Sequence, residues 1–217
     1  MKKLFAILLA LVLALSVTAC GSNDKGAELV GTWRYEMDIS EYMNDQMSQV
    51  LGGETVPDTA MSIFLTMTFN EDGTFLVDVD TDATGASFDA YMQALKPAMM
   101  EMIYQQSQDA GLTREEFDAA LAEQGTSVEN LLDSVFAMID MSSMLETLEG
   151  TSSSGYYKVA GGKLFTAENA DDLGDDTGVA YAVSGNTMSW NDPSGIMEEY
   201  EESGITISLP MVWEKQA

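Results

Sequence analysis

The clearest pattern in the chain is a strict alternation of apolar and polar positions in two neighbouring runs, "SIFLTMTF" and "TFLVDVD". Because side chains of a strand point alternately to its two faces, a period of two is typical of a strand with one face in a core. The "NEDG" between the runs supplies turn residues, and Gly73 can adopt a positive φ. The pattern therefore predicts a β-hairpin over residues 62–80. Its core-facing positions are Ile63, Leu65, Met67, Phe69, Phe75, Val77 and Val79.

Similar strand patterns occur near both ends of the chain. "LVGTWRYEMD" alternates through Trp33, Tyr35 and Met37, whereas "GYYKVAGGKLFTAE" and "GVAYAVSGNTMSWND" each predict two short strands about a glycine-containing turn. "ITISLPMVWEKQ" predicts a final strand, in which Pro210 would require a sheet edge or a bulge. Together these runs predict about eight strands, most of them joined to their sequence neighbours by tight turns.

Two segments carry helical patterns instead. "SEYMNDQMSQVLGG" predicts a short amphipathic helix with Ser40 as its N-cap. Residues 84–152 are helical in composition: Pro97 should kink or split the first helix, and Thr113 and Glu116 have the spacing of a capping box. The expected fold is therefore mainly β, with a helical segment inserted at about residues 84–152.

The first 20 residues resemble the signal of a bacterial lipoprotein. Lys2 and Lys3 precede an apolar stretch of 12 residues, Leu4 to Leu15, which suits a secretory signal. The "VTAC" that ends at Cys20 resembles a lipobox, which implies cleavage before Cys20 and acylation of its thiol. An ordinary signal peptide that happens to contain a cysteine is the alternative. We expect a signal peptide over residues 1–19, a flexible tether over 20–28 and one domain over 29–217, lipid-anchored on the extracytoplasmic face of the membrane.

Charge and composition exclude several classes of function. Without residues 1–19 the chain has 7 basic and 36 acidic residues, a net charge of −29. Such a surface repels nucleic acid and anionic headgroups, so we expect no nucleic-acid partner. The chain has no histidine and only one cysteine, which excludes histidine-based triads, histidine metal sites and an internal disulfide.

The first strand also carries a family resemblance. Gly31-Thr32-Trp33 is similar to the "G-x-W" motif of lipocalin-like and fatty-acid-binding-type barrels, the calycins. The "GYYKVAGGKL" and "YAVSGNTM" units resemble lipocalin-like domains of bacterial surface lipoproteins. The resemblance covers residues 29–82 and 154–215 and implies an eight-stranded antiparallel up-and-down barrel. It also implies that Trp33 packs across the closed end of the barrel, with Lys215 as its basic partner.

A lipocalin-like barrel implies a ligand in its interior or at its mouth. We therefore expect the protein to bind a small apolar molecule or a peptide, although side chains fill many barrels of this size. The candidate lining residues are Tyr35, Met37, Phe75, Val77, Tyr157, Tyr181, Met188 and Trp190.

One acidic run resembles a calcium-binding loop. In "DVDTDATGASFD" the aspartates occupy positions 1, 3, 5 and 12 of such a loop, but the sixth position is Ala83 rather than glycine. A solvated strand face followed by a turn gives the same spacing. Apart from calcium no cofactor is expected. The candidate ligands are Asp78, Asp80, Asp82 and Asp89.

Two further functions stay open beside ligand binding. The first is a non-catalytic interaction module of the cell envelope with a filled barrel, which would present an exposed apolar helix face to another protein. The second is a carboxylate-based hydrolase, which would need two carboxylates converging in a cleft. A cavity of about several hundred Å³ in the barrel would favour ligand binding over both.

Overall fold

The computed structural model describes residues 26–51, 59–138, 152–174, 178–192 and 208–216. Within these ranges eight antiparallel strands form a closed barrel, in which each strand pairs with its sequence neighbours and the last pairs with the first. This confirms the mainly β fold with a helical insertion. The strands are β1 (Gly31–Asp38), β2 (Ser62–Phe69), β3 (Thr74–Val79), β4 (Ser153–Ala160), β5 (Lys163–Ala167), β6 (Val179–Ser184), β7 (Thr187–Asp192) and β8 (Met211–Lys215).

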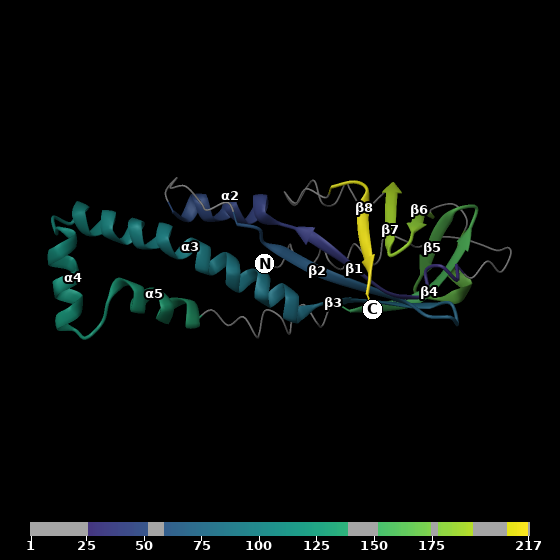
Figure 1. The fold of residues 1–217 in the computed structure, drawn as a ribbon, viewed down its shortest axis with the longest axis horizontal. Coiled ribbons are helices and arrows are strands. Elements are labelled where there is room, and N and C mark those ends of the chain that lie inside the picture. Colours follow the sequence, from purple (N-terminus) through teal and green to yellow (C-terminus); the bar gives the residue numbers. More distant parts are fainter. Residues whose placement is uncertain (1–25, 52–58, 139–151, 175–177, 193–207, 217) are drawn as a thin grey trace.

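The long helices lie at one end of an elongated molecule and the barrel at the other (Figure 1). Helix α2 (Ser40–Val50) connects β1 to β2, and a 3₁₀ turn, η1 (Ala170–Asp172), connects β5 to β6. Between β3 and β4 lie α3 (Thr81–Asp109), α4 (Arg114–Glu123) and α5 (Val128–Ala137). Helix α3 runs away from the barrel, α4 crosses its far end and α5 lies back alongside α3 (Figure 1). We call α3, α4 and α5 the helical arm.

The alternation of the sequence sets the inner face of the barrel. In β1, β2 and β3 every second residue is buried, and the register places Tyr35 opposite Leu65 of β2 on one side and Trp213 of β8 on the other. Side chains of α2 and of the first half of α3 extend this core beyond the barrel. Those from α2 are Tyr42, Met43 and Met47, and those from the first half of α3 are Phe88, Tyr91, Met92 and Leu95; Ala98, Met99 and Met102 follow from its second half.

Hydroxyl groups at the base of α3 fix the arm to the barrel. Strand β3 ends at Val79, which pairs with Leu65, so the first residues of β2 have no strand beside them on that edge. The hydroxyl groups of two α3 residues accept the hydrogen bonds that this edge would otherwise lack: Thr84 from the N–H of Phe64 at 3.1 Å and Ser87 from the N–H of Ser62 at 2.8 Å. Because buried N–H groups need a partner, these two bonds determine where α3 begins to pack.

Some predicted details of the insertion and the helices are wrong. Helix α3 begins at Thr81 rather than Thr84, because the side chain of Asp80 accepts a bond from the N–H of Ala83 at 3.0 Å and caps the helix. It also continues through Pro97 without splitting, since the exposed proline costs a single backbone hydrogen bond while buried residues on both sides hold the helix. Ser40 is the first residue of α2 rather than its cap, and its N–H donates to the Asp38 carboxylate at 2.8 Å.

Other details are confirmed. The turns of the strand pairs contain Gly73, Gly161, Gly162 and Gly185 at positive φ, and Thr113 and Glu116 form the predicted capping box of α4. The prediction that Pro210 would require a sheet edge or a bulge is wrong, because Pro210 precedes β8 and this strand pairs on both sides. Among the helices described, none combines the length and apolar character needed to span a membrane.

Candidate functional site

Trp33 lies near the start of β1, at the end of the barrel that we call its base. The indole N–H of Trp33 donates to the carbonyl of Leu29 at 2.6 Å, and Lys215 Nζ lies 4.9 Å from the centroid of the Trp33 ring. Gly31 has a φ of 121°, and a Cβ there would meet the Lys215 side chain at 3.0 Å. The structure therefore brings together the Gly31, Trp33 and Lys215 that the resemblance implies, and gives each a packing role.

The N-terminal turn also packs at this base. Of the expected tether, residues 20–28, the structure describes only residues 26–28, and Cys20 lies outside the described residues. Gly26 is buried against Val159, and the Tyr181 hydroxyl donates to the carboxylate of Glu28. The chain is thus packed on the barrel from Gly26 onward rather than only from Leu29.

The centre of the barrel holds a cluster of aromatic rings. The ring centroids of Tyr35 and Trp213 lie 5.3 Å apart, and those of Trp190 and Trp213 lie 5.0 Å apart. Burial, and to a smaller degree Asp38, raises the pKa of the Tyr35 hydroxyl, so this phenol stays neutral. Trp213 was not among the predicted lining residues, although the alternation of Met211, Trp213 and Lys215 on the last strand is a signal that could have found it.

Buried side chains surround this cluster. Trp33, Met188, Trp190, Met211 and Trp213 are each 0 % exposed, so none of them borders a space large enough for a water molecule. The predicted lining residues Met37, Phe75, Val77 and Tyr157 are also buried, while Tyr181 is half-buried. The expected ligand-binding residues therefore come together as a packed core.

Among the described residues, three buried side-chain polar atoms of the barrel strands β5, β7 and β8 have no hydrogen-bond partner. They are Oγ1 of Thr166 and the indole nitrogens of Trp190 and Trp213. Leaving a buried polar group unpaired costs about 1–3 kcal/mol. Trp33, by contrast, has its indole N–H bonded to the chain.

The four aspartates proposed as calcium ligands lie on different elements. Asp78 is on β3 and accepts a bond from the N–H of Val79 at 2.8 Å, Asp80 caps α3, and Asp82 and Asp89 lie within α3. Asp80 also forms an ion pair with Arg34 at 3.4 Å. Because α3 starts directly after Asp80, the calcium-loop register is not formed, and the described residues contain no group of three acidic side chains that could hold an ion.

The helical arm is held by a small core and by ion pairs. Leu121, Val128 and Leu132 are its buried residues, and side chains from α3 such as Ile103 and Tyr104 pack against them. Lys96 of α3 binds two carboxylates of α5, Glu129 at 3.1 Å and Asp133 at 2.7 Å. The hydrogen bond to Asp133 is the main cause that raises the pKa of Lys96.

Arg114, at the start of α4, is also fully engaged within the arm. Its guanidinium pairs with the Glu101 carboxylate and lies 4.3 Å from the centroid of the Tyr104 ring. The Tyr104 hydroxyl in turn donates to Asp118 at 2.9 Å. These contacts join α3 to α4, and they pair the positive charge of Arg114 with a carboxylate of the arm itself.

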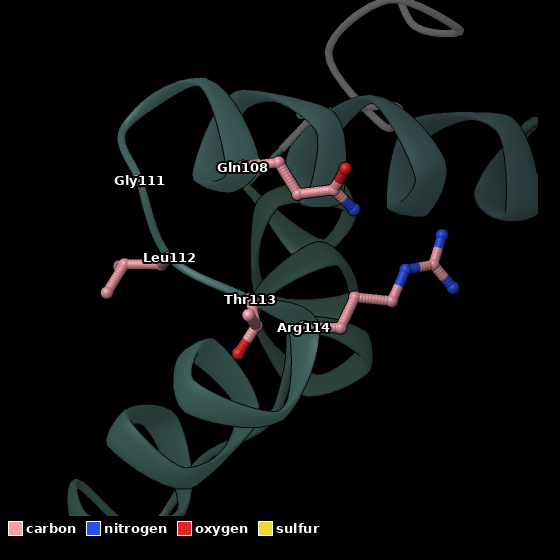
Figure 2. Close-up of a pocket in the computed structure, with 5 residues that line it drawn as sticks. All are labelled: Gln108, Gly111, Leu112, Thr113 and Arg114. Carbon is pink, nitrogen blue, oxygen red and sulfur yellow. The ribbon is translucent and has the colours of Figure 1, made fainter.

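A surface hollow lies at the turn between α3 and α4 (Figure 2). It has a volume of about 370 Å³, is open to solvent and is lined by Gln108, Gly111, Leu112, Thr113 and Arg114. The side chains of Gln108 and Arg114 extend to one side of it and that of Leu112 to the other (Figure 2). The Thr113 hydroxyl and N–H both bond to Glu116, whose pKa they lower, so this shift belongs to a helix start rather than to a catalytic pair.

An exposed apolar row runs along α5. Leu131, Val135 and Met138 are 40 %, 48 % and 78 % exposed, whereas Val128 and Leu132 on the neighbouring face are buried. Spacings of four and three residues place the exposed side chains on one face of the helix. We call Leu131, Val135 and Met138 the α5 row.

Comparison of the chain with protein-family models, with curated proteins and with solved structures finds no match in any of the three. The candidate site is therefore defined by its geometry: a packed barrel and a projecting arm with an exposed apolar row.

Proposed function

We propose that the protein is a non-catalytic interaction module of the cell envelope, in which the packed barrel supports the arm and the α5 row contacts another protein. The observation that carries this proposal is the contrast between the two ends of the molecule. The buried apolar side chains of the barrel core are at most 8 % exposed, and those exposed on its outer surface, Leu76, Tyr156 and Val212, lie on three different strands. On α5, by contrast, three apolar side chains that are 40–78 % exposed share one helical face.

The packing of the barrel favours this function over binding of a small molecule. A ligand site needs a space of several hundred Å³ lined by apolar groups. Here the two indole rings at the centre are in contact with each other and have no accessible surface. A ligand would have to displace Trp190 or Trp213, at the cost of the core that they form.

The barrel also supports the proposed lipocalin-like relationship. An eight-stranded closed barrel whose first strand begins with a tryptophan across the base, under a basic side chain of the last strand, is the arrangement that the "G-x-W" resemblance implies. The relationship extends to the barrel and not to the helical arm, which lies outside the resembling residues 29–82 and 154–215 for most of its length.

Lipid attachment at Cys20 completes the proposal. The turn from Gly26 to Leu29 is packed at the base, a few residues after the lipobox-like "VTAC". Replacing Cys20 with alanine should release the protein from the membrane fraction, and continued membrane fractionation of that variant would refute acylation.

Site-specific photo-crosslinking tests the interaction function. A benzoylphenylalanine at Val135 of the full chain, expressed in its own host, should give a discrete adduct whose second protein then binds the purified chain. The matched control is Val212 on the outside of β8, which is exposed to a similar extent, 45 % against 48 %. Equal adducts from both positions, or none from Val135, would overturn the proposal.

A further inference from the structure

We infer that the segment that binds the α5 row is an amphipathic helix with basic residues beside its apolar face. This inference rests on the proposed function, because it names the partner for the same surface. It is carried by two independent features of the arm, the geometry of the row and the distribution of charge around it.

The geometry suits a helix. The α5 row follows positions i, i+4 and i+7, which form a straight ridge along a helix surface. Such a ridge packs into the groove between the ridges of a second helix. The row contains one branched leucine, one valine and one methionine, and methionine adapts its shape to differing partners.

The negative charge of the arm favours a partner segment with a positive net charge. Residues 81–138 contain ten carboxylates and two basic side chains, a net charge of −8. Both basic side chains are already neutralised: Lys96 lies between Glu129 and Asp133, and Arg114 pairs with Glu101. An approaching segment therefore meets a negative field around an apolar row, and this field attracts a basic segment and repels an acidic one.

The same charge disfavours a second copy of this chain as the occupant. Two arms brought together through their α5 rows would each carry a net charge of −8, and the two whole chains would each carry −27. The two copies would therefore repel each other. Anionic headgroups of a membrane surface are repelled for the same reason, although the row itself is apolar.

Three synthetic peptides of about 18 residues, or five helical turns, test the inference with the purified chain from Cys20 onward carrying alanine at that position. The first has leucines on one helical face and lysines on the other, the second has glutamates in place of the lysines, and the third is a scramble of the first. Fluorescence anisotropy should show the lysine peptide binding at least tenfold more tightly than either control, and its affinity should fall as salt is raised.

Neutral substitutions separate the apolar contact from the charge. Val135→Asn should weaken binding of the lysine peptide at least fivefold, and Met138→Asn should weaken it as well, whereas Val212→Asn on the barrel should leave it unchanged. Because these side chains are exposed, the variants should retain the circular dichroism of the parent. Equal binding of the scrambled peptide, or binding that Val135→Asn does not alter, would overturn the inference.

The crosslinking experiment distinguishes failure of this inference from failure of the proposed function. A Val135 adduct that maps to an acidic or non-helical segment of the partner would overturn the basic helix and leave the interaction function in place. Absence of any Val135 adduct would overturn both.

Discussion

The hydroxyl of Thr84, in the first turn of α3, accepts a hydrogen bond at 3.1 Å from the backbone N–H of Phe64 on the edge of β2. This hydroxyl accepts the hydrogen bond that a neighbouring strand would otherwise accept at this edge of β2. Asp80 adds an ion pair to Arg34, whose guanidinium lies 4.1 Å from the centroid of the Phe64 ring. The direction in which the arm leaves the barrel is therefore set by side-chain contacts within the first two turns of α3.

Replacing Thr84 with valine should loosen the base of the arm. Valine keeps the shape of this buried side chain but leaves the Phe64 N–H without an acceptor, so we expect a loss of about 1–3 kcal/mol in the free energy of unfolding. Hydrogen exchange should show faster exchange of the Phe64 amide. Ser134→Ala is the control, because that hydroxyl bonds only within α5, to the carbonyl of Asn130. Unchanged exchange at Phe64 in the Thr84 variant would contradict the role assigned to the hydroxyl.

The tryptophans of the barrel should differ in their response to phenylalanine. Trp33→Phe removes an indole N–H that bonds to the Leu29 carbonyl, whereas Trp190→Phe removes an N–H that has no partner. Both changes lose similar apolar volume from fully buried positions. We therefore expect Trp33→Phe to cost about 1–3 kcal/mol more than Trp190→Phe in denaturant unfolding. Equal costs would mean that the Trp190 N–H is bonded in solution.

The ion pairs of Lys96 should make the arm sensitive to alkaline pH. Bonds to Asp133 and Glu129 raise the pKa of Lys96 in the folded protein above its ordinary value of 10.5. Their contribution to stability is therefore complete below that value and is lost as pH rises through the raised pKa. Thermal unfolding at pH values on either side of this window should show a fall in Tm that is smaller in Lys96→Met, where only the buried tyrosines such as Tyr35 still contribute to it. If Lys96→Met showed the same fall in Tm as the parent protein, the group whose titration destabilises the protein would not be Lys96.

Replacing Pro97 with alanine should stabilise α3. Pro97 is exposed within a continuous helix of 29 residues, so alanine restores a backbone N–H without leaving a cavity. We expect a gain of up to about 3 kcal/mol in the free energy of unfolding of the arm. Native-state hydrogen exchange around residues 93–101 measures it. A loss of protection there would show that the proline is needed for packing of α3 against α5.

The barrel could be predicted from the sequence because each of its strands carries a local signal. The alternation in β1, β2 and β3 identifies the inward residues directly, and the glycine-containing turns identify the strand pairs. Whether the inward residues fill the barrel could not be predicted, since the packing of Trp213 against Tyr35 and Trp190 depends on the closure of β8 onto β1.

The helical character of the arm could be predicted from its composition, but the start of α3 and the faces that its helices bury could not. The aspartates at residues 78, 80 and 82 alternate as they would on a strand, yet Asp80 caps a helix, and only the geometry of β2 shows why α3 begins there. The exposure of the α5 row could not be predicted from the sequence for a similar reason. Leu131, Leu132 and Val135 are all apolar in the sequence, and only the contacts with α3 and α4 in the structure show that Leu132 is buried and the other two are exposed.

The base at Trp33 and the origin of α3 lie toward opposite ends of β1 and β3. An anchor at Cys20 would therefore set the base toward the bilayer and direct the arm outward. Helix α3, with 29 residues, is about 44 Å long. Together with the height of the barrel, this length would keep α4 and the start of α5 away from the lipid headgroups. The arm could then contact proteins that do not themselves touch the membrane.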